Sequence, residues 1–354
     1  MNQETNVQEK KARVRQPWTA KRVGNLLLNN ALIIIMVIAV IYIAIKNPNF
    51  TQPPSVINIL SQTAAYLPAA LGIGGCIVLT GTDLSAGRVV GLTACISASL
   101  LQNAANLANK MWPQIGTLPV IVVVLLAMLI GAAVGCFNGF FVAKFKLHPF
   151  IVTLGTQLIL YTCLLLYVQM GNNKGMAISN LDPSYTSFVK GKLFSIGGTP
   201  IPNYVLFAIL LTAVMWFIWN KTTFGKNMFA VGSNPEAANV SGVNVFKTTV
   251  MVHTLAGCMY GLEGFIESAR IQSNTATTGL NYECDAIAAC VIGGVSFVGG
   301  TGKISGIVLG VFLLRIIFVA LNMLSISQNL QYVIKGLIIL IACSIDMRKY
   351  LVKK

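Results

Sequence analysis

Long apolar runs follow one another along almost the whole chain and are separated by short polar segments. Each run is close to the ~20 residues that a helix needs to cross a bilayer. Two runs, 88–107 and 284–299, are rich in Gly, Ser and Ala, and either is expected to be broken or partly re-entrant. The pattern predicts an all-α polytopic membrane protein with about ten transmembrane helices, at 26–45, 56–80, 88–107, 118–142, 150–169, 203–219, 249–268, 284–299, 304–323 and 329–346.

The polar segments define the predicted layout. Residues 1–25 form a basic tail, 26–346 the membrane domain with a polar loop at about 221–247, and 347–354 a second basic tail. Basic residues are concentrated in the tails and in alternate loops, so the positive-inside rule predicts that both termini and the 221–247 loop lie in the cytoplasm. The polar lead before the first run favours a retained span over a cleaved signal peptide.

Composition agrees with this class. Of the 354 residues, 55% are hydrophobic and 10% charged, whereas a soluble domain carries about 25% charged residues. The net charge of +15 follows from the positive-inside bias, so nucleic acid is not an expected partner, whereas membrane lipid is. The eight cysteines lie in or beside apolar runs without C-x-x-C spacing, as small apolar residues would.

One polar stretch, Gly232 to Val245 (GSNPEAANVSGVNV), predicts a short helix between two membrane runs. Asn234 suits the N-cap, Pro235 the first helical position and Glu236 the first turn, while Gly242 suits the residue that ends a helix. About two turns are too few to be stable alone in water. The stretch therefore predicts a helix that needs a partner.

Motifs for catalysis or cofactor binding are missing from the sequence. The run GGVSFVGGTGKIS at 293–305 lacks the Ser or Thr that must follow the lysine of a phosphate loop, since Ile304 stands there. We interpret it as a tight cytoplasmic turn. His148 and His253 have no metal-ligand spacing, and no hydrolase signature appears. We predict no catalytic residue, no metal site and no bound cofactor.

Charges beside apolar runs are more informative, because each one buried in a bilayer costs about 2.5–3.5 kcal/mol or more. Asp83 could cap a helix end while Arg88 neutralises it, or both could belong to a broken helix beside a substrate path. Glu263, Glu267, Arg270, Glu283 and Asp285 could form a docking rim or an ordinary solvated loop. Arg315 needs a carboxylate or carbonyl groups as its partner.

Glycines four residues apart predict close helix packing. Gly131, Gly135 and Gly139 form one small-residue face, and Gly257/Gly261 and Gly306/Gly310 repeat the spacing. Packing within the chain is favoured over a dedicated dimer face.

Several of these blocks together resemble a known family. Glu236, Ala237, Ala238 and Gly242 fit the E-A-A-x-x-x-G cytoplasmic loop of ABC importer permeases. TGTDLSAGRVVGL, HPFIVTLGT, FGKNMFAVGSNPEAA, DAIAACVIGGVSFVGGTG and YVIKGLIIL are similar, in order, to blocks of the monosaccharide permeases in that group. Thr82 and Ala86 favour the galactose/methyl-galactoside branch over the ribose branch. Cys284 and the charged Arg315 depart from the family pattern.

The resemblance implies the ABC importer permease fold in a bacterial inner membrane, and a set of partners. Two permease copies would pair, an extracytoplasmic sugar-binding protein would deliver substrate, and a double-headed ABC ATPase would bind ATP and Mg. It also implies roles for three groups of residues: an ATPase-coupling helix (Asn234, Pro235, Glu236, Ala237, Ala238, Gly242), a substrate pathway (Asp83, Ser85, Thr156) and a binding-protein docking rim (Glu267, Arg270, Glu283).

Because the binding protein would supply recognition, few fixed sugar-binding residues are expected. Two alternatives stay open. The first is a same-family importer of ribose, xylose or a nucleoside. The second is a proton-coupled secondary transporter that uses Asp83 or Glu263 as a relay.

Overall fold

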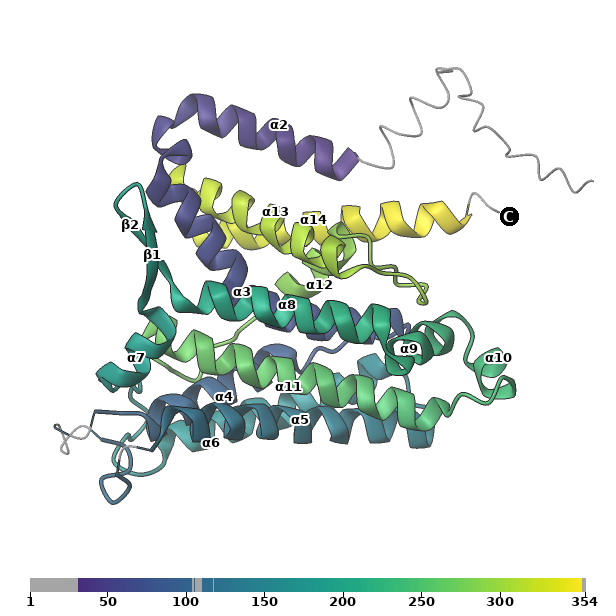
Figure 1. The fold of residues 1–354 in the computed structure, drawn as a ribbon, viewed down its shortest axis with the longest axis horizontal. Helices are drawn as coiled ribbons and strands as arrows, with labels where there is room; N and C mark the ends of the chain where they lie inside the picture. Colours follow the sequence, from purple (N-terminus) through teal and green to yellow (C-terminus); the bar gives the residue numbers. More distant parts are fainter. Residues whose placement is uncertain (1–30, 104, 106–109, 117, 352–354) are drawn as a thin grey trace, which may run out of the picture.

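The computed structural model describes residues 31–351 apart from 104, 106–109 and 117, and the predicted tail at 1–25 lies outside this part of the chain. Long helices run side by side across the molecule (Figure 1). The elements are α2 (Ala31–Lys46), η1 (Pro48–Thr51), α3 (Pro53–Val78), α4 (Ala86–Leu100), α5 (Val120–Phe145), α6 (Pro149–Gln169), α7 (Pro183–Lys190), β1 (Lys192–Ile196), β2 (Thr199–Pro202), α8 (Asn203–Lys221), α9 (Thr223–Ser233), α10 (Pro235–Val240), α11 (Val245–Ile271), α12 (Tyr282–Ile292), α13 (Ile304–Met323) and α14 (Gln328–Leu351).

Six of the described helices are long and apolar enough to cross a membrane: α3, α5, α6, α8, α13 and α14. The helical class is therefore confirmed, while the predicted number of ten spans stays a prediction. The all-α description was incomplete, because β1 and β2 pair as an antiparallel hairpin. Gly197 and Gly198 both have positive φ, which is the backbone geometry of a tight two-residue hairpin turn.

The two suspect runs are indeed shorter than their predicted spans. Helix α4 covers 86–100 rather than 88–107, and α12 covers 282–292 rather than 284–299. The side chain of Gln102 holds the chain beyond α4 in a non-helical path, because it donates to Ser179 O and accepts from Met111 N. Gly293 and Gly294, the latter at φ +82°, end α12.

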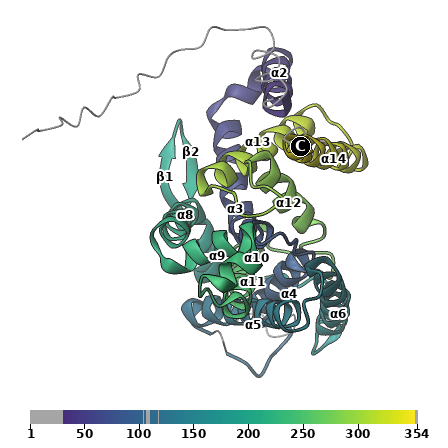
Figure 2. The same cartoon turned by 90° about the vertical axis from the view of Figure 1, so that its right-hand side faces the viewer.

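Helix α11 lies at the centre of the bundle, packed against α3, α4 and α5 (Figure 2). The glycine faces explain its closest contact. A Cβ on Gly135 would lie 2.0 Å from His253 O, and one on Gly257 would lie 2.0 Å from Gly131 O. The predicted packing of these glycines within the chain is confirmed, and Gly310 repeats it against Ala289 of α12.

The molecule has two distinct ends. Helix α10 lies at one end, together with the start of α2 and the end of α14, whereas α7 and the β hairpin lie at the other (Figure 1). The start of α2 and the end of α14 thus lie on the same side as the 221–247 loop; the place of the two termini and the side that faces the cytoplasm stay predictions. Helix α14 continues to Leu351, past the boundary predicted at 346.

Candidate functional site

The short helix predicted at the 221–247 loop is present as α10. The side chain of Asn234 caps it, its Oδ1 accepting a hydrogen bond of 3.0 Å from Ala237 N, and Pro235 is its first residue. Gly242 follows it at φ +85°, and Val243 N donates to Ala238 O. The prediction of this helix from local rules is confirmed, including its cap and its stop.

Helix α10 offers an exposed surface. Ala238 is buried, and it anchors the helix to the protein, but Val240 is 90% exposed and Glu236 is also exposed. Helix α9, which sequence reasoning missed, leads directly into α10; the Thr222 hydroxyl caps it by accepting from Gly225 N. Val240 and Glu236 are therefore among the side chains of α10 that are open to contact from outside.

The glycine-rich segment 293–303 lies beside this surface. Gly300 N donates to Val78 O at the end of α3, and a Cβ on Gly232 of α9 would lie 2.9 Å from Gly300 N. Asp346 of α14 accepts from Ser296 Oγ at 2.9 Å. The segment therefore contacts α3, α9 and α14 at the end of the molecule that carries α10. It borders a pocket of about 580 Å³ whose wall includes Phe229.

The three predicted pathway residues lie together just before α4 and on α6. Asp83 Oδ1 accepts from Ser85 N at 2.9 Å and from Ser85 Oγ at 2.6 Å. Asn138 of α5, which sequence reasoning missed, donates to Ser85 Oγ and accepts from Thr156 Oγ1. All four side chains are buried. We call Asp83, Ser85, Asn138 and Thr156 the hydroxyl cluster.

The expected neutralisation of Asp83 by Arg88 was wrong. Among the described residues Arg88 forms no ion pair with Asp83; its guanidinium lies 4.5 Å from the centre of the Tyr161 ring, and its Nη1 is 3.4 Å from Ala276 O. Asp83 accepts from the backbone N–H of Ser85, the residue that precedes α4, but no side chain caps the first turn of α4 itself.

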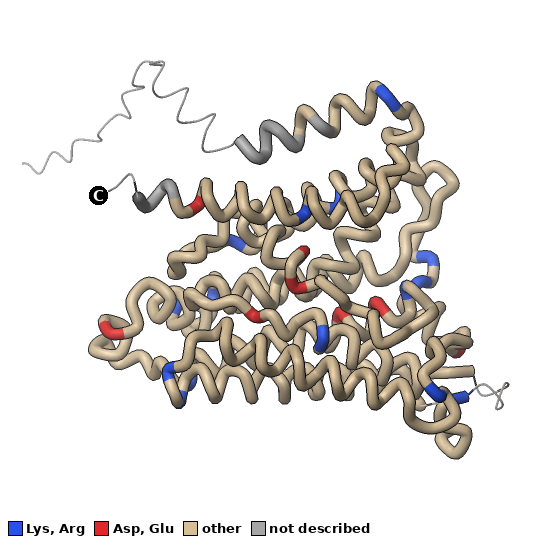
Figure 3. The backbone as a smooth tube through the Cα atoms, turned by 180° about the vertical axis from the view of Figure 1, so that it is seen from behind, with Lys and Arg blue, Asp and Glu red and all other residues tan. Residues whose placement is uncertain are grey.

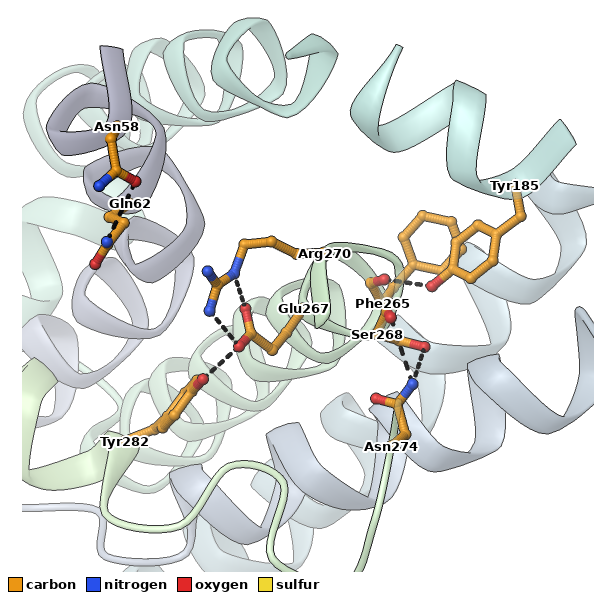
Figure 4. Close-up of polar contacts among 9 residues, drawn as sticks. All are labelled: Asn58, Gln62, Tyr185, Phe265, Glu267, Ser268, Arg270, Asn274 and Tyr282. Carbon is orange, nitrogen blue, oxygen red and sulfur yellow. Dashed lines mark hydrogen bonds and ion pairs between the residues drawn. The ribbon is translucent and has the colours of Figure 1, made fainter. Parts of the chain in front are cut away.

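The predicted docking residues lie deeper than an external rim. Glu267 pairs with Arg270 through two hydrogen bonds of 2.5 and 2.6 Å, and the Tyr282 hydroxyl donates to the same carboxylate (Figure 4). Glu267 and Glu283 are 1% and 4% exposed, whereas a quarter of the Arg270 side chain reaches solvent. The docking role stays a prediction, and Arg270 is its surface-exposed member.

The partner of Arg315 is a carboxylate, which was one of the two partners expected from the sequence, the other being carbonyl groups. Its Nη2 lies 2.6 Å from Asp285 Oδ2, and Lys335 Nζ lies 2.5 Å from Asp285 Oδ1. The Arg315 guanidinium also lies over the Tyr66 ring, 3.7 Å from its centre. Lys335 was not assigned a role from the sequence. We call Asp285, Arg315 and Lys335 the charge triad.

A pocket of about 440 Å³ lies over these charged groups, between α3, α11, α12, α13 and α14. The charge triad, Glu267 and Arg270 all line it. Figure 3 shows acidic and basic positions in the middle of the molecule, between the layers of helices. The volume of this pocket lies within the range of about 300–1,000 Å³ typical of small-molecule sites.

The first turns of α4 and α12 meet beside this pocket. A Cβ on Gly87 would lie 2.0 Å from Glu283 Oε2 and 2.4 Å from Gly279 O. Two short helices thus begin within the protein with their N-terminal ends facing one another. Interrupted helices are tolerated at membrane depth only where protein or a polar cavity satisfies the backbone, and half-helix ends of this kind form the substrate sites of many transporters.

Comparison of the sequence with known proteins also indicates a transport protein. Residues 55–343 match the family described as branched-chain amino acid transport system / permease component. The chain belongs to this permease family. It is similar to the galactose/methyl galactoside import permease of Haemophilus influenzae, with 41% identity over 330 residues, 93% of this chain and 97% of that protein.

Two further relatives differ in their sequence identity to this chain. The galactose/methyl galactoside import permease of Escherichia coli is 42% identical over 91% of this chain and 94% of its own length. The ribose import permease of Haemophilus influenzae is 33% identical over 92% and 95%. No solved structure matches the chain. This permease is a multi-pass integral membrane protein and a transport component of an importer.

Proposed function

We propose that this permease is the membrane subunit of an ATP-driven importer of galactose and methyl galactosides. The observation that carries the proposal is the difference in identity between relatives of nearly equal coverage. The galactose/methyl galactoside permeases are 41–42% identical to the chain, whereas the ribose permease is 33% identical. Ribose is therefore the second candidate, and xylose or a nucleoside follows it.

The energy source is expected on another chain, because the one phosphate-loop-like run has Ile304 where a metal-holding hydroxyl is required. A double-headed ABC ATPase would bind ATP and Mg and contact two copies of this permease. An extracytoplasmic sugar-binding protein would deliver substrate at the end that carries α7 and the hairpin.

Helix α10 is the proposed contact with the ATPase. It is six residues long, it has one buried anchor, Ala238, and it exposes Val240 almost completely. Lys221 and Lys226, both exposed on the segments leading into it, add positive charge. ATP binding can shift the permease only through an element that the ATPase grips differently in its two states. Helix α10 is joined directly to α11, the central helix of the bundle.

Substrate assignment can be tested by uptake. The permease, its ATPase and its binding protein would be expressed in a strain without other galactose uptake, and labelled galactose would be offered with an excess of unlabelled competitors. We expect methyl galactoside to compete and ribose not to compete. Competition by ribose, with no effect of methyl galactoside, would overturn the galactose assignment.

Coupling can be tested by changes to α10. Glu236→Trp and Gly242→Trp are expected to leave the ATPase able to hydrolyse ATP but to abolish uptake. A bulky side chain at exposed Glu236 obstructs the contact surface, and one at Gly242 is strained at φ +85°. Normal uptake with normal stimulation of the ATPase would count against α10 as the coupling element. A proton gradient driving uptake without the ATPase would favour the secondary-transporter alternative.

A further inference from the structure

The pocket over the charge triad has an unusual balance of charge. Glu267 is matched by Arg270 in a two-bond ion pair. Asp285, by contrast, faces two cations at once, Arg315 at 2.6 Å and Lys335 at 2.5 Å. The pocket lining therefore carries one positive charge in excess. Ionisable residues within membrane spans, such as the two cations that share Asp285, are an indication of function.

The hydrogen-bonding groups of the triad are mostly donors. A lysine ammonium has three N–H groups and a guanidinium five, whereas Asp285 has two acceptor oxygens. Both of those oxygens already lie against the cations. The Lys335 side chain is 14% exposed, so part of it faces the pocket. A ligand that fits this surface must supply acceptor oxygens.

The part of α14 beside Lys335 supplies an aromatic face and an amide. Tyr332 is 42% exposed as a residue, and Lys335 Nζ lies 5.3 Å from the centre of its ring. Gln331 Nε2 donates to Asn322 Oδ1 and Ile326 O, which leaves the Gln331 carbonyl oxygen out of both bonds. Tyr66, between Arg315 and Tyr282, is already covered, with the Tyr282 ring 4.7 Å away. Tyr332 is thus the ring with a face available to a ligand.

We propose that this pocket is a hexose site inside the permease, an assignment that rests on the proposed sugar-import function. The apolar C–H face of the sugar ring packs on Tyr332, and Lys335 donates to sugar hydroxyl oxygens. Arg315 acts as a positioning residue, because it holds Asp285 and is itself held by Tyr66. The binding protein selects the sugar, and this pocket receives it.

The arrangement of the pocket also suits passage rather than retention. It lies beside the meeting point of α4 and α12, and its walls come from five helices. A movement of α12 against α14 separates Asp285 from Lys335 and from Tyr332, because the first lies on α12 and the other two on α14. A site assembled in this way loses its ligand when the helices move, which import requires.

Direct binding is the first test. The permease and its ATPase would be assembled in lipid nanodiscs without the binding protein, and saturation-transfer NMR would follow galactose. We expect saturation of the galactose ring protons. Lys335→Met and Tyr332→Ala are each expected to weaken binding roughly tenfold, the usual effect of losing a charge-assisted hydrogen bond or a packed ring. Tyr332→Phe keeps the ring and is expected to bind as the wild type does.

Matched controls separate this result from damage to the fold. Lys192→Met removes an exposed lysine from β1, which contributes no residue to the pocket lining, and is expected to change nothing. Unchanged ATP hydrolysis and an unchanged gel-filtration profile would show that the pocket variants are assembled. Absence of saturation transfer in the wild type, or equal binding by Lys335→Met, Tyr332→Ala and the wild type, would overturn the proposal.

A second ligand tests the chemistry of the pocket. Galacturonate has the same ring with a carboxylate in place of the hydroxymethyl group at C6, so an anion site would prefer it to galactose. Displacement of galactose by much lower concentrations of galacturonate would overturn the assignment to a neutral hexose. Measuring uptake distinguishes the proposed import function from the proposed hexose site. Galactose uptake by the wild type without galactose binding in the nanodisc would contradict only the hexose site. No galactose uptake by the wild type contradicts the proposed function.

Discussion

The short helices α4 and α12 each begin next to a buried aspartate, and the two aspartates are held by different kinds of group. At the start of α4, Asp83 is held by the hydroxyl and backbone of Ser85, and Asn138 links this group to Thr156. At the start of α12, Asp285 is held by Arg315 and Lys335. The hydroxyl cluster is fully buried, whereas the charge triad lines a pocket of about 440 Å³.

The two aspartates were expected in different roles, Asp83 as a helix cap or pathway residue and Asp285 in a docking rim or a solvated loop. In the structure each precedes or begins a short helix. A buried and mutually hydrogen-bonded cluster stabilises one arrangement of helices. Charged groups beside a cavity also cost free energy to place, and they can contact a ligand. We therefore expect changes in the hydroxyl cluster to affect stability first, and changes in the charge triad to affect transport as well.

The largest effect is expected from Arg315→Leu. It leaves Asp285 with Lys335 alone and removes the cation over Tyr66, and breaking a buried pair costs about 3–5 kcal/mol. Melting of the purified protein, followed by gel filtration after heating, should shift strongly downward. Adding both Asp285→Leu and Lys335→Met to Arg315→Leu should recover part of this loss, because no charge of the triad then remains. A wild-type melting temperature for Arg315→Leu would contradict the structural role of the triad.

Gly87→Ala is expected to have the next largest effect. The new Cβ would lie 2.4 Å from Gly279 O, a backbone atom that cannot swing aside, and overpacking of this kind costs about 1–3 kcal/mol. Gly155→Ala on α6 is the matched control, since a Cβ there meets nothing within 4 Å. The melting temperatures of the two variants measure the difference in their stability. Equal melting of the two would show that the helix starts are not tightly packed.

Asp83→Ala is expected to cost about 1–3 kcal/mol, because the Ser85 N–H and hydroxyl lose their acceptor in a buried place. Uptake per folded molecule should be close to that of the wild type. Uptake should instead fall in Asp285→Asn. The prediction that Asp83, Ser85 and Thr156 line the pathway would prevail if Ala substitutions there stopped uptake and left the melting temperature unchanged.

Asn234→Ala is expected to have the smallest effect on stability, about 1 kcal/mol and confined to α10, because it removes the side-chain cap on Ala237 N. ATPase stimulation by sugar-loaded binding protein should decrease without a change in overall melting. Asn239→Ala, on an exposed position of the same helix, is the control. An equal decrease in both variants would show that the cap itself is unimportant.

Local features of this molecule were predictable, and contacts between distant segments were not. Helix α10 follows from adjacent residues, since Asn234, Pro235 and Gly242 each act within a few positions of themselves. The limits of α4 do not, because a Gly-, Ser- and Ala-rich run is compatible with helix beyond Leu100. What ends the helix there is Gln102, which bonds Ser179 across a loop.

In the candidate site, too, local features were predictable and contacts between distant residues were not. Arg315 was recognisable as a buried charge in need of a partner, but Asp285 lies 30 residues away and Lys335 on another helix. Hydropathy carries no information on which span faces which. A lysine within an apolar run, such as Lys335, was the one available signal that a second cation belonged to this site.

The close seam between α5 and α11 has a mechanical consequence. Glycines on both sides bring the two backbones into contact, so α11 is braced along its middle and resists bending. A helix of 27 residues is about 40 Å long. If the ATPase moved α10, α11 would carry that movement from its short link with α10 at one end to Glu267 and Arg270 at the other. Tilting it by about 5° displaces its far end by about 3.5 Å over that length, enough to open or close a passage for a small molecule.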